Sequence, residues 1–582
     1  MNLFQKMGLA LIVLSFAACA DLDELLVNPN GVDPSQADAQ SLYNAIQLEF
    51  NGSNDRNGNI NGVQLRTWGF TSGLSRMRAE IGGFTYTATH SPTEFDALWT
   101  DFYAGFLPDV ATFIEIAEPL GLNGAIGSVK VMEAYSYMMM VDLFGDIPLT
   151  ESGLGGAEEQ VLNPGRTDAA AVYDYAEGLL DEAIMLLDSA SNFSVAYDNF
   201  YGGDVQDWAA LARTLKLRAS ITTRLVGGAG DISDIVASGN IIDTNGENFE
   251  FQYGTNRLNP RNRHPFYSDS YEASDGTYMS NWYMWLLAES KGFPDPRTRY
   301  YFYRQENALY PDIVADDPNA FDCIYTDVPD PDAIPPHYEA ISDDMPYCLG
   351  SYGMSYFGRD HLNGSGIPPD GFYRTVYGLY PAGGKFDNGV RDGEVQNNGV
   401  DGALGAGINP IWQASWTHFV LAEAALTGNY EEGDAAELLA DGITLSMDRV
   451  RDFESLVNGG EILATTPTTV TVANTFPADS LFDEYVEYVV DEFNDADEEG
   501  KLGIVAREYL IALFGNGIEA YNLYRRTCLP SNLQPGIDPN AGAFIRSAFY
   551  PSVHVNRNIN ANQKASYTEP VFWDTNDASC NY

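Results

Sequence analysis

The stretch 129–144, VKVMEAYSYMMMVDLF, decides the fold class of this chain. Wound as an α-helix, it places apolar side chains on almost every side, which is typical of a helix buried between other helices. The next long segment, 168–190, is amphipathic, with apolar residues at spacings of three and four. Together the two patterns predict a mainly helical protein. The apolar positions of the second segment are Val172, Ala176, Leu179, Ala183 and Leu186.

Helical patterns recur along much of the remaining sequence. In 206–226, an apolar stripe runs through Trp208, Leu211 and Leu215. Several segments are joined in pairs by short Gly/Pro/Asn loops, which predicts helical hairpins stacked in series, although no tetratricopeptide signature can be aligned. The other predicted helices are 36–50, 95–117, 412–427, 434–451, 478–491 and 502–515.

The stretch from about 243 to 410 has a different character. It is rich in Gly, Pro, Asn, Asp, Tyr and Trp, and a long helix cannot run through so many helix-breaking residues. A long irregular region in a helical chain is normally either disordered or functional, and the aromatic content here argues against disorder. We therefore expect a single domain over 36–582 that contains an ordered, loop-rich subdomain at about 243–410.

The charge of the chain excludes one class of partner. Its 582 residues include 31 Lys and Arg against 82 Asp and Glu, a formal net charge of −51. Such a surface repels phosphate backbones, so nucleic-acid binding is excluded. Because charged residues are 19% of the chain and hydrophobic residues 45%, the acidity does not indicate a disordered polyacid, and a large core can form.

The N-terminus predicts export. Residues 1–18 combine Lys6, an apolar run and two small residues before Cys19, as in a signal peptide. Phe16-Ala17-Ala18-Cys19 resembles a bacterial lipobox, so we predict cleavage before Cys19, acylation of its thiol with chains such as palmitate, and a tether over 19–35. An ordinary secretory signal with an incidental cysteine is the alternative.

Four further cysteines permit two disulfides in an exported protein, with three possible connectivities. They are Cys323, Cys348, Cys528 and Cys580. Closeness in sequence favours Cys323 with Cys348 and Cys528 with Cys580.

Enzyme motifs are missing from the sequence: it has no GxSxG, HExxH or Walker phosphate loop. With 82 acidic residues, a close carboxylate pair is almost inevitable and carries no information about glycoside hydrolysis. Residues 495–500, DADEEG, copy the opening of an EF-hand loop, but Ala506 stands where a bidentate Glu is needed. We therefore predict no catalytic residue, cofactor or metal site. A hard cation in the Asp/Gly/Asn loop 387–402 is an alternative that solvated turns explain equally well.

Tryptophans beside polar loop residues are the best candidates for a ligand site. A flat ring stacks on the C–H groups of a sugar or peptide while neighbouring Asn, Arg and Asp bind hydroxyls or amides. On this ground Trp68, Trp282 and Trp285 are predicted stacking platforms, unless they only anchor loops to the helices. The predicted polar contacts are Arg76, Arg78, Asn259, Arg261 and His264, and Tyr86 and Tyr267 could serve in either way.

A set of motifs occurs in a characteristic order along the chain. The motifs are Asn28-Pro29-Asn30, VKVMEAYSYMMMVDLFGDIPLTES at 129–152, PGRTDAAAVYDYAEGLLDEAI at 164–184, GGDVQDWAALARTLKLRASI at 202–221, Asp295-Pro296-Arg297, FVLAEAALTG at 419–428, DGITLSMDRV at 441–450, the stretch 504–530 and FYPSVHVNRNINAN at 549–562. With this ordered set the chain resembles, from Cys19 to Trp573, the SusD/RagB family of nutrient-binding outer-membrane lipoproteins. Two positions depart from the usual pattern of that family: Tyr521, where Trp is common, and Cys528, where Gly is usual.

The resemblance implies a core of four tetratricopeptide-like helix pairs decorated by irregular ligand-binding segments. It also implies a non-catalytic protein, lipid-anchored on the outer membrane and facing the cell exterior. Such a protein captures oligosaccharides, or oligopeptides in the RagB-like branch, for a SusC-like TonB-dependent transporter. A hydrolase with unrecognised carboxylates and a purely structural or adhesive surface protein are the alternatives outside this class.

Overall fold

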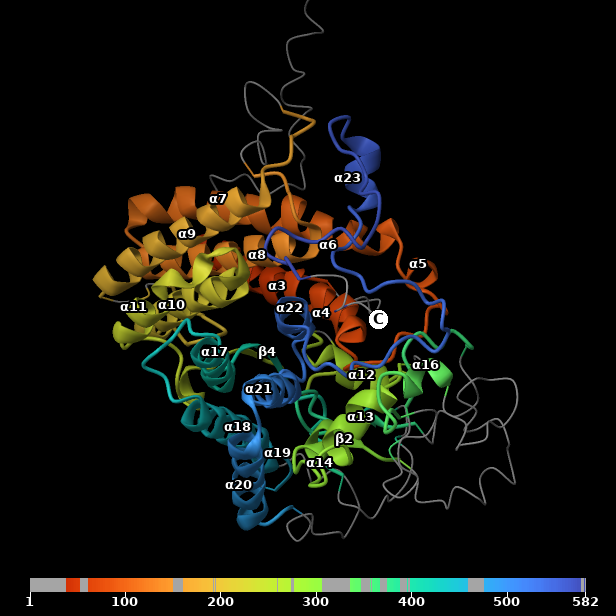
Figure 1. Cartoon of the computed structure of the whole chain (residues 1–582). Coiled ribbons are helices and arrows are strands. Elements are labelled where there is room, and N and C mark those ends of the chain that lie inside the picture. The colour runs from red at the N-terminus through yellow and green to blue at the C-terminus, as the bar shows by residue number, and fades with distance from the viewer. Residues whose placement is uncertain are drawn as a thin grey trace, which may run out of the picture.

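The computed structural model describes residues 38–52, 61–149, 161–191, 193, 195–258, 260–273, 277–305, 335–346, 356, 358–366, 374–387, 395, 398–458, 476–576 and 580. Helices dominate this part of the chain (Figure 1), which confirms the predicted fold class. The longer ones are α3 (Ala39–Asn51), α4 (Val63–Leu74), α7 (Leu107–Ala117), α8 (Asn123–Phe144), α9 (Ala169–Ser189), α10 (Val205–Thr222), α17 (Ala414–Leu426), α18 (Ala435–Asp452), α20 (Asp479–Asp495), α21 (Glu498–Ala512) and α22 (Gly517–Thr527).

Shorter helices connect these elements or lie in the loop-rich part of the chain. They are α5 (Tyr86–Thr89), α6 (Asp96–Thr100), α11 (Ile232–Ala237), α12 (Pro265–Tyr271), α13 (Asn281–Ala288), α14 (Thr298–Tyr301), α16 (Pro336–Glu339), α19 (Glu454–Asn458) and α23 (Ser552–Arg557). The single helix predicted at 95–117 is in fact α6, a π-helical segment (Asp101–Phe106) and α7 in succession.

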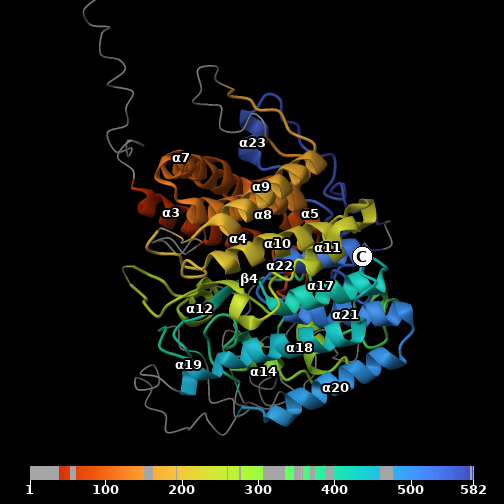
Figure 2. The same ribbon diagram turned by 90° about the vertical axis from the view of Figure 1, so that its left-hand side faces the viewer.

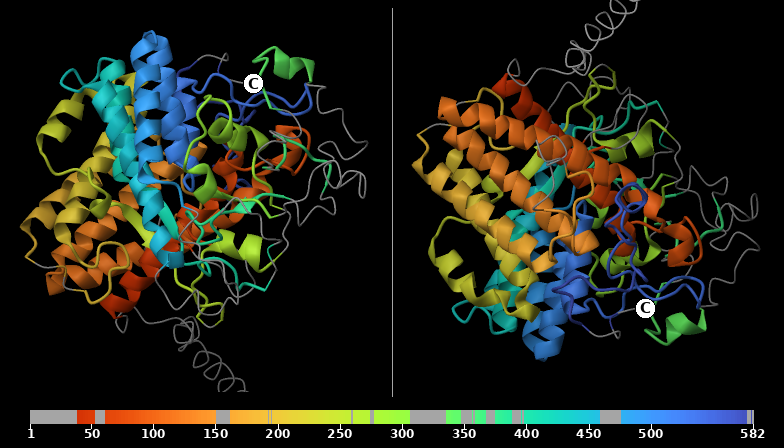
Figure 3. Two further views of the ribbon diagram at one scale, coloured as in Figure 1. Left: turned by 90° about the horizontal axis from the view of Figure 1, so that it is seen from below. Right: turned by 90° about the horizontal axis from the view of Figure 1, so that it is seen from above.

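The long helices pack one on another in series. Helix α8 packs on α9, α9 on α10, α10 on α17, and α17 on both α18 and α21, with α20 against the last two. Figure 2 shows this stack descending the molecule from α7 to α20. The serial packing is consistent with the predicted tetratricopeptide-like helix pairs. Seen from below and above, the stacked helices occupy one side of the molecule and the green loop-rich segments the other (Figure 3).

Helix α8 is the buried helix that its composition predicts. All but two of its residues are buried, including the polar Glu133 and Asp142, while α9 buries only one stripe. Aspartates begin several neighbouring helices as N-caps: the Asp168 side chain accepts the Ala170 amide, and Asp204 accepts the amides of Gln206 and Asp207. Asp497, in the EF-hand-like stretch, caps α21 by accepting the Gly500 amide at 2.9 Å. That stretch is therefore a helix start.

Buried ion networks join segments that are distant in sequence. Arg297 contacts Asp295 at 2.7 Å and Glu508 at 3.0 Å, and Lys291 lies 3.1 Å from Asp295. The side chains of all four residues are at most 1% exposed. In the same way Arg526 of α22 contacts Glu423 of α17 at 2.8 Å. Since a lone buried charge is strongly unfavourable, these networks specify which helices can meet.

Two small antiparallel sheets organise the loop-rich stretch. Strand β1 (Phe249–Gln252) pairs with β4 (Ile408–Trp412), which ties the beginning of the stretch to its end. Strand β2 (Phe302–Tyr303) pairs with β3 (Val376–Tyr377). The described parts of this stretch also hold α12, α13, α14 and α16, so it is less irregular than its composition predicts. The proposed domain boundaries stay a prediction.

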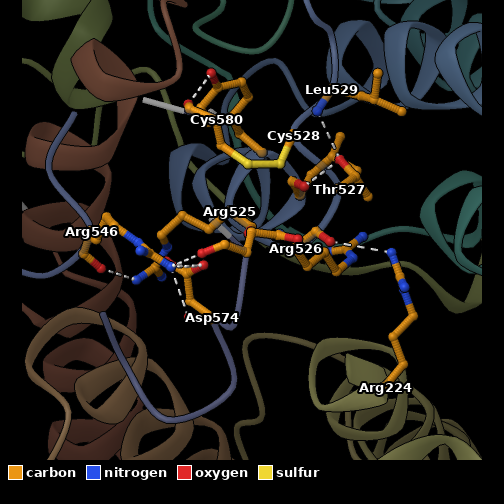
Figure 4. The surroundings of a disulfide bond; sticks show 12 residues. Arg224, Arg525, Arg526, Thr527, Cys528, Leu529, Arg546, Asp574 and Cys580 are labelled. Atoms are coloured by element: carbon orange, nitrogen blue, oxygen red, sulfur yellow. Dashed lines mark hydrogen bonds and ion pairs between the residues drawn. A yellow bond between two sulfur atoms is a disulfide. The ribbon is translucent and has the colours of Figure 1, made fainter. Parts of the chain in front are cut away.

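A disulfide joins Cys528 to Cys580, one of the two predicted pairs (Figure 4). Cys528 ends α22 in the left-handed conformation, with φ of 58°, which explains why glycine suits this position in related sequences.

The other pair, Cys323 and Cys348, lies outside the described residues, as do the signal peptide, Cys19 and the tether. No helix in the described part of the chain is both long and apolar enough to cross a membrane.

Candidate functional site

Three extended segments meet beside the end of α4. The middle segment is 277–281. On one side of it, the Ala79 amide donates to the Tyr278 carbonyl (3.0 Å). On its other side the Arg359 amide donates to the Met279 carbonyl (3.0 Å), and the Asn281 amide donates to the Arg359 carbonyl (2.9 Å). Arg78 and Met279 form an antiparallel bridge, and Ser280 and Arg359 a parallel one. Residues far apart in sequence are thereby fixed at one place.

Trp68 lies under this junction, within α4. Its ring contacts Phe266 at a centroid distance of 3.9 Å, and Phe266 stacks on Tyr377 at 5.2 Å. The Arg78 guanidinium lies 5.2 Å from the centre of the Trp68 ring. The structure thus brings together two of the predicted site residues, although only 3% of Trp68 is exposed.

Arg76 and Tyr86 form a buried hydrogen-bonded group. Arg76 donates to the Tyr86 hydroxyl (3.1 Å) and to the Gln534 carbonyl (2.8 Å), and the same hydroxyl lies 3.0 Å from Nε2 of His361. Burial lowers the pKa of His361 well below its usual value, so this ring stays neutral. Neither Arg76 nor Tyr86 has exposed surface. Both side chains therefore hold neighbouring segments of the protein in place. The prediction that they contact a ligand directly does not fit the structure.

The second predicted group lies around α12. His264 begins this helix by accepting the Phe266 amide at 3.1 Å, and its other ring nitrogen lies 3.0 Å from the Ile408 carbonyl. Burial lowers the pKa of His264 to about 3. Tyr267 stacks on Tyr271 with ring centres 4.6 Å apart and donates to the Asp401 carbonyl. His264 and Tyr267 are enclosed and stabilise the fold. The prediction that they contact a ligand does not fit these positions.

The remaining predicted residues have mixed positions. Trp282 in α13 has no exposed surface, so its ring offers no face to a ligand and the predicted stacking role does not fit the structure. Trp285 in the same helix is half-buried. Arg261 is partly exposed and paired with Glu272 at 3.0 Å. Asn259 lies outside the described residues. Of the ten predicted contacts, Arg78, Arg261 and Trp285 retain partial exposure.

The structure adds side chains at the junction that the sequence does not single out. Arg359 and Arg374 both lie over the Tyr278 ring, with guanidinium carbons 4.5 and 5.6 Å from its centre. Phe84 is 40% exposed and follows Gly83, whose backbone packs directly against Gly364. We call Arg78, Tyr278, Arg359, Arg374 and Phe84 the junction site. These residues belong to none of the motifs found in the sequence. The only signal for them is that Arg and Tyr are frequent in the segments where they lie.

Two cavities formed by described residues lie elsewhere. One, of about 370 Å³, is lined by Arg166, Tyr550 and Lys564 among others. The second, of about 380 Å³, lies between α3 and the π-helical segment, lined by Glu49 and Asp101. Neither includes a predicted contact residue. Among the described residues no group of three or more His, Cys, Asp or Glu side chains could hold a metal ion.

Comparisons with known proteins agree with the architecture. Residues 33–313 match a family model described as "Starch-binding associating with outer membrane", and residues 407–569 one described as "Susd and RagB outer membrane lipoprotein". No curated protein matches the chain.

Several solved structures share the fold. A SusD homologue from Bacteroides fragilis has a TM-score of 0.62 at 15% identity, covering 93% of this chain and 100% of its own. A chitin-binding SusD homologue from Flavobacterium johnsoniae has a TM-score of 0.61 at 16% identity, with the same coverage. At this identity the likeness shows the fold alone.

Proposed function

Because the chain belongs to the SusD/RagB family of outer-membrane lipoproteins, we propose that it binds oligosaccharides at the cell surface and delivers them to a SusC-like TonB-dependent transporter. In this role the protein captures and hands over its ligand without cleaving it. Acylation at Cys19 holds it on the outer membrane, facing the exterior.

The junction site carries this proposal. An exposed aromatic ring beside fixed polar donors is the combination that sugars need, because the ring covers C–H faces while the donors bind hydroxyls. We take Phe84, an exposed ring six residues after Arg78 in the sequence, as such a ring, and Arg78 supplies donors held in place by Trp68 and by the Thr277 hydroxyl at 3.1 Å. The starch-binding description of one family model and the chitin-binding relative support a glycan ligand.

An oligopeptide ligand is the second candidate within the same kind of importer. The RagB name in the second family model favours it, and guanidinium groups also bind peptide carboxylates. The two ligand classes differ in what they need most: a glycan depends on the ring, and a peptide carboxylate depends on the arginines.

Binding assays on the purified mature protein test the proposal. We expect calorimetry against neutral and acidic oligosaccharides to detect binding, and product analysis after long incubation to detect no cleavage. Phe84→Ala should weaken glycan binding. The matched control is Tyr175→Ala, which removes a ring of equal exposure, 41%, from α9.

Three results would contradict parts of the proposal. Turnover of any polysaccharide would support the hydrolase alternative. Binding of peptides and of no glycan would support the RagB-like alternative. An equal effect of both ring substitutions would remove Phe84 from the site. Delivery is tested separately, by whether a SusC-like transporter co-purifies with this protein from its native membrane.

A further inference from the structure

Three arginines of the junction site lack the carboxylate partners that several of the enclosed arginines have. Arg218, Arg297 and Arg526 are enclosed and each contacts at least one carboxylate within 3.0 Å. By contrast, Arg78, Arg359 and Arg374 have no carboxylate oxygen within 4.0 Å in the described chain. In a protein with 82 acidic residues, three unpaired neighbouring cations need an explanation.

The absence of carboxylate partners among the described residues matters more because two of these arginines are buried. Arg359 is 1% exposed, and its Nη1 and Nη2 have no hydrogen-bond acceptor among the described residues. Arg374 is 4% exposed and donates to the Thr277 carbonyl at 3.0 Å, while its Nε has no acceptor. A buried guanidinium without an acceptor is costly, because the donors have lost water and gained nothing in return. An anion bound at Arg78 would offset part of the positive charge of this buried pair.

The three side chains share one place. Arg78 donates to the Thr277 hydroxyl and Arg374 to the Thr277 carbonyl, while Arg359 and Arg374 both lie over the Tyr278 ring. Arg78 is the member that solvent reaches. The two buried guanidinium groups add positive potential beneath it, in surroundings where charge is poorly screened.

The acidic groups nearby are already engaged. Glu80 is two residues from Arg78; its carboxylate interacts electrostatically with Arg78 and Arg76, but its nearest cationic contact is the His90 ring at 3.8 Å. Asp360 follows Arg359 and accepts hydrogen bonds from Gln534 at 2.8 Å and from Asn281 at 3.4 Å. Arg76 adds a further cation, bonded only to neutral acceptors among the described residues. Positive charge therefore prevails at the junction.

We propose that the Arg78, Arg359 and Arg374 cluster recognises the carboxylate of a uronic acid, so that the ligand of this protein is an acidic oligosaccharide. A guanidinium presents two parallel donors to a carboxylate, which neutral sugars cannot match. Arg78 makes the contact, and the buried pair strengthens it through its field. This inference rests on the proposed function, since it names the glycan class that the same site takes.

Titration calorimetry with chemically matched sugars tests it. The probes are oligogalacturonate, oligoalginate and an oligoglucuronate, each beside the same oligosaccharide after reduction of its carboxyl groups to hydroxymethyl groups. We expect at least one acidic probe to bind about tenfold or more tightly than its reduced counterpart, with an affinity that falls as salt rises. Arg78→Gln should remove this preference, and Arg78→Lys should keep part of it because the charge remains.

The control is Arg213→Gln, which removes an arginine of α10 that pairs with Asp188 far from the junction. It should leave the preference unchanged. Equal binding of acidic and reduced probes, or binding of neutral glycans alone, would overturn the inference while the proposed glycan function stands. Binding of acidic peptides without any glycan would overturn both. If Arg78→Gln proves unstable in a thermal melt, the comparison of probes on the unaltered protein still decides.

Discussion

Arg218 of α10 and Asp142 of α8 form an ion pair of 2.5 Å in which neither side chain has any exposed surface. The same guanidinium donates to Glu519 of α22 at 2.9 Å and to the Tyr173 hydroxyl of α9 at 3.0 Å. Asp142 also accepts the indole N–H of Trp573 at 2.9 Å. This one group joins four helices and the C-terminal segment, and all of its charged members lie in segments that carry the family resemblance.

Breaking this pair should destabilise the protein strongly. Asp142→Asn leaves a buried guanidinium short of one negative charge, so we expect the free energy of unfolding to fall by about 3–5 kcal/mol. The measurement is denaturant-induced unfolding followed by circular dichroism. Asp181→Asn is the control, because Asp181 pairs with Lys216 while 58% exposed and should cost about 1 kcal/mol or less. Equal losses in the two variants would contradict the role of the buried pair.

The disulfide should contribute measurably to stability. Cys580→Ala opens the link to Cys528, across a sequence separation of 52, and should cost about 2–4 kcal/mol. Adding Cys528→Gly should restore a part of this, about 1 kcal/mol, because glycine adopts the positive φ of that position without strain. Thermal melts of the two variants check the order. A double variant less stable than Cys580→Ala would show that the left-handed conformation costs nothing.

Stability should fall as pH rises from about 4.5 to 7 because of Glu133. Burial raises the pKa of this carboxyl from 4.5 to about 7, with Lys130 opposing and Glu182 adding to the shift. The folded chain therefore keeps a proton in this window that the unfolded chain has released, and the free energy of unfolding decreases with pH. Glu133→Gln should reduce this dependence, of which Glu49, with a pKa also raised to about 7, supplies a further part, and should stabilise the protein at pH 8 by up to about 3 kcal/mol.

Unfolding curves at pH 4.5 and pH 8 check the Glu133 prediction. Glu115→Gln, at an exposed position on α7, is the control and should leave the pH dependence as it is in the unaltered protein. A steep pH dependence that persists in Glu133→Gln would assign the effect to another group.

Acylation is the fourth expectation. In cells given an alkyne analogue of palmitate, the unaltered protein should become labelled and sediment with membranes, whereas Cys19→Ser should be unlabelled and released. Retention of label in Cys19→Ser would favour another anchor. Loss of the label with retention at the membrane would indicate that the transporter alone holds the protein there.

Local pattern predicts the helical framework closely. The predicted segments 434–451 and 168–190 correspond to α18 (Ala435–Asp452) and α9 (Ala169–Ser189). Each is amphipathic and begins at an aspartate cap, so periodicity and capping mark its ends. Helix α4 lacks such a stripe because it is buried on almost every side, so periodicity does not predict it.

The sequence by itself determined the helical class, the buried central helix and the family, because each depends on residues close together or on ordered motifs, and it favoured the Cys528–Cys580 pair among three connectivities. Only the tertiary structure decided which aromatic and charged side chains face solvent. Trp282 lies enclosed in α13, while Arg78, Arg359 and Arg374 meet from three distant segments, with no carboxylate within 4.0 Å among the residues that the structure describes. Burial and charge compensation arise from contacts between remote segments, and no local pattern encodes them.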